Sequence, residues 1–120
     1  MSGRLTTHVL DVSRGKPAEG MRVQLWRLDD GEASVLVAES LTNCDGRLDR
    51  PLLEQQTMEA GTYQLLFFAG DYFARCRHEA EPPAPFLDIV PVRFTISNPH
   101  EHYHVPLLAA PGGYSTYRGS

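Results

Sequence analysis

The chain has 120 residues, of which 42% are hydrophobic, and a formal net charge of −4 at pH 7. This length suits one domain over residues 1–120, whose core needs neither a disulfide nor a structural metal. The acidic balance and the scattered basic residues argue against nucleic-acid binding. No apolar run approaches the roughly 18 residues of a membrane span, and no secretory leader is evident, so we expect no membrane contact and a cytoplasmic location.

Short hydrophobic runs with a period of two, broken every 8 to 15 residues by Gly, Pro or Asp-Gly, predict an all-β protein. Strands are expected at residues 5–12, 21–28, 34–41, 62–68, 89–96, 102–108 and 114–117, with a short strand after Gly46. Eight strands are enough for a sandwich of two four-stranded sheets.

The turns and the one expected helix follow from Gly, Pro, Asn and Asp. Residues 14–17 separate the first two strands, residues 29–31 close a hairpin, and residues 43–46 form a turn that needs a positive φ. A helix is expected at residues 70–78, with Asp71 as its cap. The prolines at residues 81–85 predict an extended surface loop after it.

The two cysteines do not form a motif. Cys44 and Cys76 lie far apart, and neither belongs to a C-x-x-C sequence. Two free, partly buried thiols are therefore favoured over a disulfide, which the count alone would allow.

Three histidines alternate near the end of the chain, at His100, His102 and His104. On a strand this spacing would place all three on one face, where they could hold zinc. Pro99 precedes them, so His100 is expected in a turn and at the surface rather than on the strand. We therefore favour a site without a metal.

Two further polar residues occupy positions that admit two interpretations each. His8 lies in the middle of the first strand, with Thr6 and Leu10 on its face, and suits either a cleft or a structural hydrogen bond. Arg47 follows the Asp45-Gly46 turn, where an isolated guanidinium is more often a solvated charge. The polar, β-prone residues 114–120 predict an ordered C-terminus.

Several segments together resemble the transthyretin-related proteins, specifically the 5-hydroxyisourate hydrolases. They are LTTHVLDVSRGKPAEGMRVQLWRL, TNCDGR, GTYQLLFF, HYHVPLL and the closing YSTYRGS. The matches run from Leu5 to Ser120 in the family's order, and the terminal Tyr-Arg-Gly-Ser is its most diagnostic segment. One departure is local: residues 86–89 read Phe-Leu-Asp-Ile where many members have Phe-Phe-Pro, and Pro91 falls inside the expected sixth strand. The departure could reshape that strand's beginning, at a subunit edge.

The resemblance implies a transthyretin-like sandwich with one short helix, assembled as a homotetramer, a dimer of dimers with a central channel. It also implies that the first and seventh strands are neighbours, so that residues on both can face that channel. The implied reaction is the hydrolysis of 5-hydroxyisourate to 2-oxo-4-hydroxy-4-carboxy-5-ureidoimidazoline in urate degradation, with no cofactor and no metal.

The family's functional residues match positions in this sequence. The implied catalytic residues are His8, Arg47, His104 and Ser120, the implied substrate-binding residues are His8, Arg47, Tyr117, Arg118 and Gly119, and His102 is expected to support His104. Two other functions remain open: a transthyretin-like small-molecule binding protein that uses the channel, and a β-sandwich adhesion module. The hormone carriers lack this set of histidines and the Tyr-Arg-Gly-Ser ending, and an adhesion module would not need an ordered polar terminus.

Overall fold

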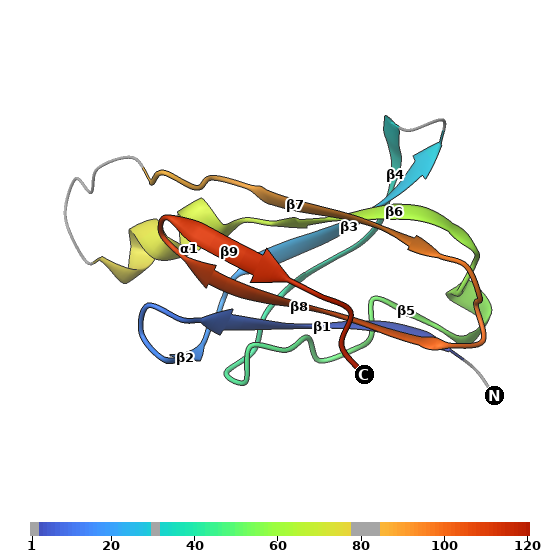
Figure 1. Cartoon of the computed structure of the whole chain (residues 1–120), viewed down its shortest axis with the longest axis horizontal. Coiled ribbons are helices and arrows are strands. Elements are labelled where there is room, and N and C mark those ends of the chain that lie inside the picture. The colour runs from blue at the N-terminus through green and yellow to red at the C-terminus, as the bar shows by residue number, and fades with distance from the viewer. Residues whose placement is uncertain (1–2, 30–31, 78–84) are drawn as a thin grey trace.

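The computed structural model describes residues 3–29, 32–77 and 85–120 (Figure 1). The strands are β1 (Arg4–Asp11), β2 (Lys16–Pro17), β3 (Arg22–Asp29), β4 (Glu32–Leu41), β5 (Leu53–Glu54), β6 (Gly61–Phe67), β7 (Val90–Ile96), β8 (His102–Ala110) and β9 (Gly113–Thr116). An α-helix, α1 (Ala69–Cys76), and a 3₁₀ turn, η1 (Gln55–Thr57), complete the described elements.

The strands form two sheets that lie face to face (Figure 1). One has the order β2-β1-β8-β9, with β5 also paired to β1, and the other has the order β4-β3-β6-β7. The pairing of β1 with β8 is parallel, whereas the remaining pairs are antiparallel. The predicted all-β sandwich is therefore confirmed, and so is the expected neighbourhood of the first and seventh strands.

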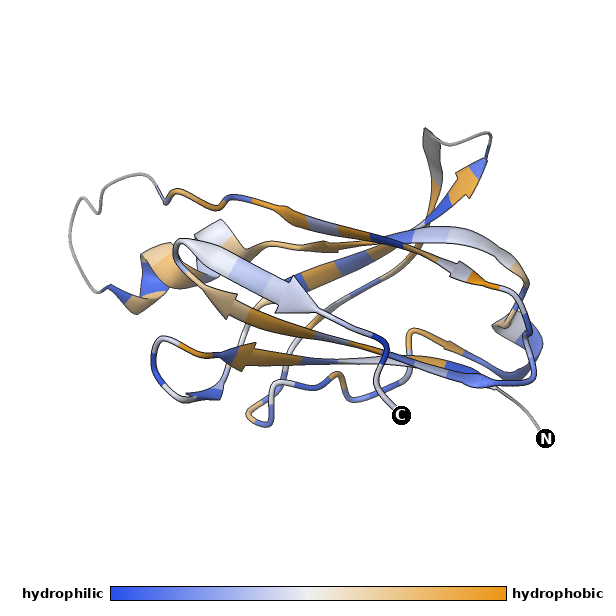
Figure 2. Cartoon of the chain, viewed as in Figure 1, coloured by the Kyte–Doolittle hydropathy of each residue, from blue (hydrophilic) through white to orange (hydrophobic). Residues whose placement is uncertain are grey.

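One face of β1 packs into the core, and the other lies on the outside of the sandwich. Leu5, Thr7, Val9 and Asp11 are turned into the sandwich, where their side chains are almost fully buried. Thr6, His8 and Leu10 alternate with these residues and are half-buried on the outer face. Figure 2 shows β8 hydrophobic along much of its length, whereas β9 is pale, near the middle of the hydropathy scale, and a short stretch of the segment after it is strongly hydrophilic.

Two short strands depart from the expected two four-stranded sheets. The strand predicted after Gly46 is reduced to an isolated bridge between His8 and Arg47, and the paired strand of this region is β5, several residues further on. The second short strand, β2, lies in the segment expected as a turn. Both pair with the side of β1 that β8 leaves open, so the first sheet has five strands.

The helix begins one residue earlier than predicted and is capped differently. Phe68 is the N-cap residue, and Asp71 lies in the first turn, where its negative charge favours the positive end of the helix dipole. The helix ends at Cys76, and the expected last residue, His78, lies outside the described ranges, as do most of the predicted loop at 81–85 and the hairpin tip at 30–31. Within the described ranges, no helix is long and apolar enough to cross a membrane.

The buried faces of α1 and β1 meet through a polar contact. The Tyr72 hydroxyl donates to the fully buried Asp11 carboxylate at 2.9 Å, and the Ser13 hydroxyl and the Arg14 amide donate to its other oxygen. Burial and the neighbouring Asp11 carboxylate raise the pKa of Tyr72. The phenol therefore stays a donor, and the buried carboxylate has the partners that it needs.

The local departure from the family pattern is accommodated at a sheet edge. Pro91 lies in β7, the last strand of its sheet, where a missing N–H costs no interior ladder bond. The backbone carbonyl of Asp88 accepts a hydrogen bond from the Gly70 amide at 2.7 Å, which fixes the segment before β7 to the start of α1. The strand begins at Val90, one residue later than expected.

The cysteines are both free thiols, as predicted. Cys76 is partly buried, whereas Cys44 is exposed, because it lies at the tip of the turn before Arg47. Thus the expectation of partial burial is correct for one of the two.

Candidate active site

The register between β1 and β8 brings two histidines to one surface. Thr6 lies opposite His104, and His8 lies opposite Pro106 two residues further along. Paired residues of adjacent strands project from the same face, so Thr6, His8 and His104 share the outer face of the first sheet. All three side chains are half-buried there.

A tight turn at residues 43–46 positions Arg47 beside His8. The Asn43 side-chain oxygen accepts hydrogen bonds from the amides of Asp45 and Arg47, at 2.9 and 3.1 Å. Gly46 has φ +76°, and a Cβ there would lie under 3 Å from the carbonyl oxygen of Val9. The residue must therefore be glycine for the turn to press against β1, where Arg47 bridges to His8.

The same turn fixes the His8 ring. Its Nε2 lies 2.8 Å from the backbone carbonyl oxygen of Asp45. A carbonyl oxygen can only accept, so Nε2 carries the proton and donates it. The Nδ1 of His8 is thus the nitrogen left to exchange a proton with another group.

His104 is contacted on two sides. Its Nδ1 lies 2.8 Å from the Thr6 hydroxyl, and its backbone carbonyl accepts a hydrogen bond from the Gly119 amide at 2.7 Å. A Cβ at residue 119 would lie 2.6 Å from Cδ2 of the His104 ring. Figure 1 shows how this happens: after β9 the chain turns back toward β8 before it ends.

The surroundings lower the pKa of His104 below the ordinary value of a histidine. Burial is the largest cause, and electrostatic interactions with Arg47 and His8 add to it. Both effects disfavour the imidazolium form, so His104 is neutral and able to accept a proton near pH 7. The three side chains therefore form one electrostatically coupled cluster, which we call the histidine–arginine cluster: His8, Arg47 and His104.

Two other predicted site residues, Tyr117 and Arg118, lie against parts of the chain outside the histidine–arginine cluster. The Arg118 guanidinium stacks over the Tyr103 ring at 4.2 Å and donates to the Glu101 carboxylate and to the carbonyl oxygen of His102. Tyr117 is 60% exposed, and with Arg118 it lines a cavity of about 280 Å³ beside β7.

The other two predicted site residues, His102 and Ser120, lie close to His104 or to its neighbour Gly119. The side chain of His102 is exposed at the first position of β8, on the same face as His104. Ser120 is exposed and directly follows Gly119, which packs against the His104 ring. The C-terminal segment therefore reaches the histidine–arginine cluster through Gly119.

Two groups that hold the site's histidines were not predicted from the sequence. Thr6 is two residues before His8, so the period of two in a strand places both side chains on the same face. Its partner His104, however, is 98 residues away along the chain. The second is the backbone carbonyl of Asp45, which orients His8 and has no side-chain signal at all.

The alternating histidines do not assemble a metal site. His100 lies in the turn before β8, as predicted, and no three His, Cys, Asp or Glu side chains gather as metal donors in the part of the chain that the structure describes.

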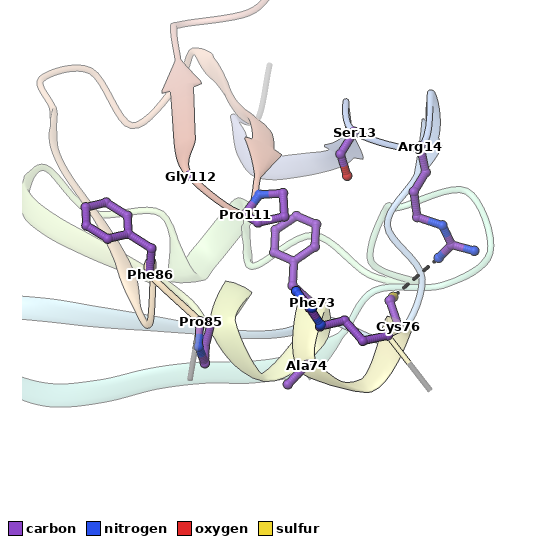
Figure 3. Close-up of a pocket in the computed structure, with 10 residues that line it drawn as sticks. Ser13, Arg14, Phe73, Ala74, Cys76, Pro85, Phe86, Pro111 and Gly112 are labelled. Atoms are coloured by element: carbon purple, nitrogen blue, oxygen red, sulfur yellow. Dashed lines mark hydrogen bonds between the residues drawn. The ribbon is translucent and has the colours of Figure 1, made fainter. Parts of the chain in front are cut away.

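A larger cavity, of about 530 Å³, lies between α1 and the turn after β1. Figure 3 shows Arg14 and Cys76 at one end of it and Phe86 at the other, with Phe73 and Pro111 between them. Arg14 donates to the Cys76 sulfur at 3.3 Å. The described residues that line the cavity include none of His8, Arg47 and His104, so this cavity is separate from the histidine–arginine cluster.

Fold and site together define a transthyretin-like β-sandwich that carries a histidine–arginine cluster on the outer face of one sheet. A family model described as HIUase/Transthyretin family matches residues 5–119. The chain therefore belongs to the HIUase/Transthyretin family.

Similar proteins include enzymes and solved structures. The 5-hydroxyisourate hydrolase of Halalkalibacterium halodurans is 57% identical over 120 residues, which is the full length of both chains. The structure of Klebsiella pneumoniae 5-hydroxyisourate hydrolase is similar with a TM-score of 0.79 and 39% identity, over 98% of this chain and 99% of that one. The crystal structure of an (S)-allantoin synthase has a TM-score of 0.89 and 50% identity over 99% of this chain, which spans only 44% of the synthase.

Proposed function

We propose that this protein hydrolyses 5-hydroxyisourate to 2-oxo-4-hydroxy-4-carboxy-5-ureidoimidazoline in urate degradation. The observation that carries the proposal is the convergence of His8, Arg47 and His104 on one face, where burial, with a smaller contribution from Arg47 and His8, lowers the pKa of His104. This arrangement occurs in a chain whose full-length relatives are named for that reaction.

The reaction needs three chemical contributions, which this cluster can supply. A water oxygen adds to a ring carbonyl carbon, the adjacent C–N bond breaks, and the leaving ring nitrogen receives a proton. One histidine takes the water proton and the other delivers a proton to the nitrogen, so that His8 and His104 share the base and acid roles. Arg47 binds the electron-rich substrate and stabilises the negative charge that develops on the carbonyl oxygen.

The C-terminal residues complete the proposed site. Gly119 packs against the His104 ring, and we propose that Ser120, the next residue, orders the attacking water or a histidine with its hydroxyl or its carboxylate. We also propose Tyr117, Arg118 and Gly119 as substrate-binding residues, with His102 supporting His104. In the single chain, Tyr117 and Arg118 lie toward the sheet edge, so their contribution is the least direct part of the proposal.

We further propose that the enzyme works as a homotetramer, a dimer of dimers, without a metal or organic cofactor and in the cytoplasm. The histidine–arginine cluster lies on an outer sheet face, and a second copy packed over that face would exclude water from it. Excluding water strengthens the electrostatic contributions of Arg47 and of the histidines. Sedimentation of the purified protein tests the assembly.

To test the function, 5-hydroxyisourate is generated in the assay by urate oxidase, and its decay is followed by ultraviolet absorbance. We expect wild-type protein to accelerate the decay, and His104→Asn to lower the rate by about 10²- to 10⁴-fold, the usual effect of removing a proton-transfer group. His100→Asn is the matched control, since His100 is exposed in the turn before β8 and should leave the rate unchanged.

Each alternative predicts a different result. A His104→Asn rate equal to that of wild type contradicts the site. No acceleration by wild type would favour the transthyretin-like binding protein, which needs no proton-transfer groups and which the family description also covers. Loss of the rate in a chelator-treated sample would favour a metal site.

A further inference from the structure

Thr6 contacts a proposed catalytic histidine but has no established role. Its hydroxyl lies 2.8 Å from Nδ1 of His104, across the parallel pair of β1 and β8. The register places the two residues directly opposite each other, so the contact is built into the sheet rather than into a loop. Thr6 is half-buried, which keeps bulk water from competing freely for the ring nitrogen.

Gly119 restrains the opposite edge of the same ring. The Cδ2 atom of His104 is so near the Gly119 Cα that a Cβ there would lie at 2.6 Å. With Nδ1 held by Thr6 and Cδ2 covered by Gly119, the ring nitrogen left for chemistry is Nε2.

We propose that Thr6 is a positioning residue, which holds His104 through Nδ1 so that Nε2 faces the attacking water and takes its proton. This inference rests on the proposed hydrolysis and deepens it, because it assigns the general base to His104. The proton moves from the water oxygen to Nε2, and the resulting imidazolium donates from Nδ1 to the Thr6 hydroxyl.

A hydroxyl suits this position better than a carboxylate would. It accepts from Nδ1–H of neutral His104, which leaves Nε2 bare to take the proton, and it accepts again from Nδ1–H of the imidazolium, so the ring stays oriented in both of its protonation states. A carboxylate would stabilise the imidazolium and raise the pKa of His104, against the effect of burial, Arg47 and His8. Thr6 thus fixes the direction of the ring without adding a charge.

His8 is oriented by a different kind of partner. The Asp45 carbonyl oxygen only accepts, which keeps a proton on Nε2 of His8 in both of its charge states. His104 is held instead at Nδ1, whose proton the Thr6 hydroxyl accepts in the proposed base state, so its bare nitrogen is Nε2. The two histidines are therefore held in chemically distinct ways, as separate base and acid roles require.

The experiment compares Thr6→Val, Thr6→Ser and Thr7→Val in the same assay. Thr6→Val removes the hydroxyl at nearly constant volume, and we expect kcat to fall by about 10- to 100-fold with KM within about threefold, because the ring loses its orientation. Thr6→Ser keeps the hydroxyl and should stay within about threefold of wild type. Thr7 is the matched control: its hydroxyl donates to the Val105 carbonyl on the buried face, so Thr7→Val should lower stability and leave kcat unchanged.

A second measurement separates the hydrogen bond from the activity. The ¹⁵N NMR shift of His104 Nδ1 should move in Thr6→Val and stay near the wild-type value in Thr6→Ser. An unchanged kcat or an unchanged Nδ1 shift in Thr6→Val overturns the proposal, and so does an equal loss of kcat in both Thr6 variants. If wild-type protein does not accelerate the decay at all, the proposed function fails, whereas the Nδ1 shift still tests the contact.

Discussion

Replacing Gly119 with alanine isolates the contact between the C-terminal segment and His104. The φ of Gly119 is not in the left-handed region, so an alanine meets no backbone strain there. Its Cβ would instead lie 2.6 Å from Cδ2 and 3.3 Å from Cγ of the His104 ring. The substitution therefore acts on the position of one side chain.

The size of the effect follows from these distances. An ordinary van der Waals contact begins at 3.4 Å, so the ring or the terminal segment must move by about 0.8 Å. A misplacement of about 1 Å in an active site can cost about 10²-fold in rate. We expect Gly119→Ala to lower kcat by about 100-fold, with the thermal midpoint unchanged, because residue 119 lies next to the end of the chain.

The assay is the decay of 5-hydroxyisourate, with Gly112→Ala as the matched control. A Cβ at Gly112 meets nothing within 4 Å, so this variant carries the same substitution without the contact and should keep the wild-type rate. A Gly119→Ala rate within twofold of wild type would refute the reasoning. An equal loss in both variants would assign the effect to the backbone rather than to the His104 ring.

Two further predictions concern charge and burial. In Arg47→Gln, the pKa of His104 measured by NMR titration should rise, because one of the positive charges that disfavour its imidazolium form is gone; an unchanged or lower pKa would contradict the proposed coupling. In Tyr72→Phe, the buried Asp11 carboxylate loses one donor, and denaturant unfolding should show a loss of about 2 kcal/mol. Tyr63→Phe is the comparison: that hydroxyl donates to the Glu59 backbone carbonyl and accepts from the partly exposed Arg27 guanidinium, so its removal leaves no buried charge short of a donor and its loss should be smaller, about 1 kcal/mol; equal losses would mean that the charge of Asp11 is unimportant.

Local patterns in the sequence were enough to predict most of the fold. The period of two and the Gly, Pro and Asp turns located the longer strands to within one or two residues, because these signals act between near neighbours. The Gly46 turn is an example: its positive φ was expected from Asp-Gly and is present. The family resemblance then selected His8, Arg47 and His104 from many polar residues.

Other features depended on partners that are distant in sequence. Both faces of the first strand carry polar residues, and the packing of Leu5 and Val9 into the core, together with the contact between Tyr72 and Asp11, decides which face is buried. The two short strands, β2 and β5, have little pattern of their own and exist because β1 offers them a free edge.

The sequence by itself determined the sandwich class and the residue types of the site, whereas the tertiary structure decided how these residues act on one another. Thr6 and His104 are 98 residues apart, and their hydrogen bond exists only because β1 and β8 pair in one particular register. A shift of one residue in that register would turn His104 away from Thr6 and into the core. Register is a property of the whole packed sheet, so no local pattern around either residue contains it.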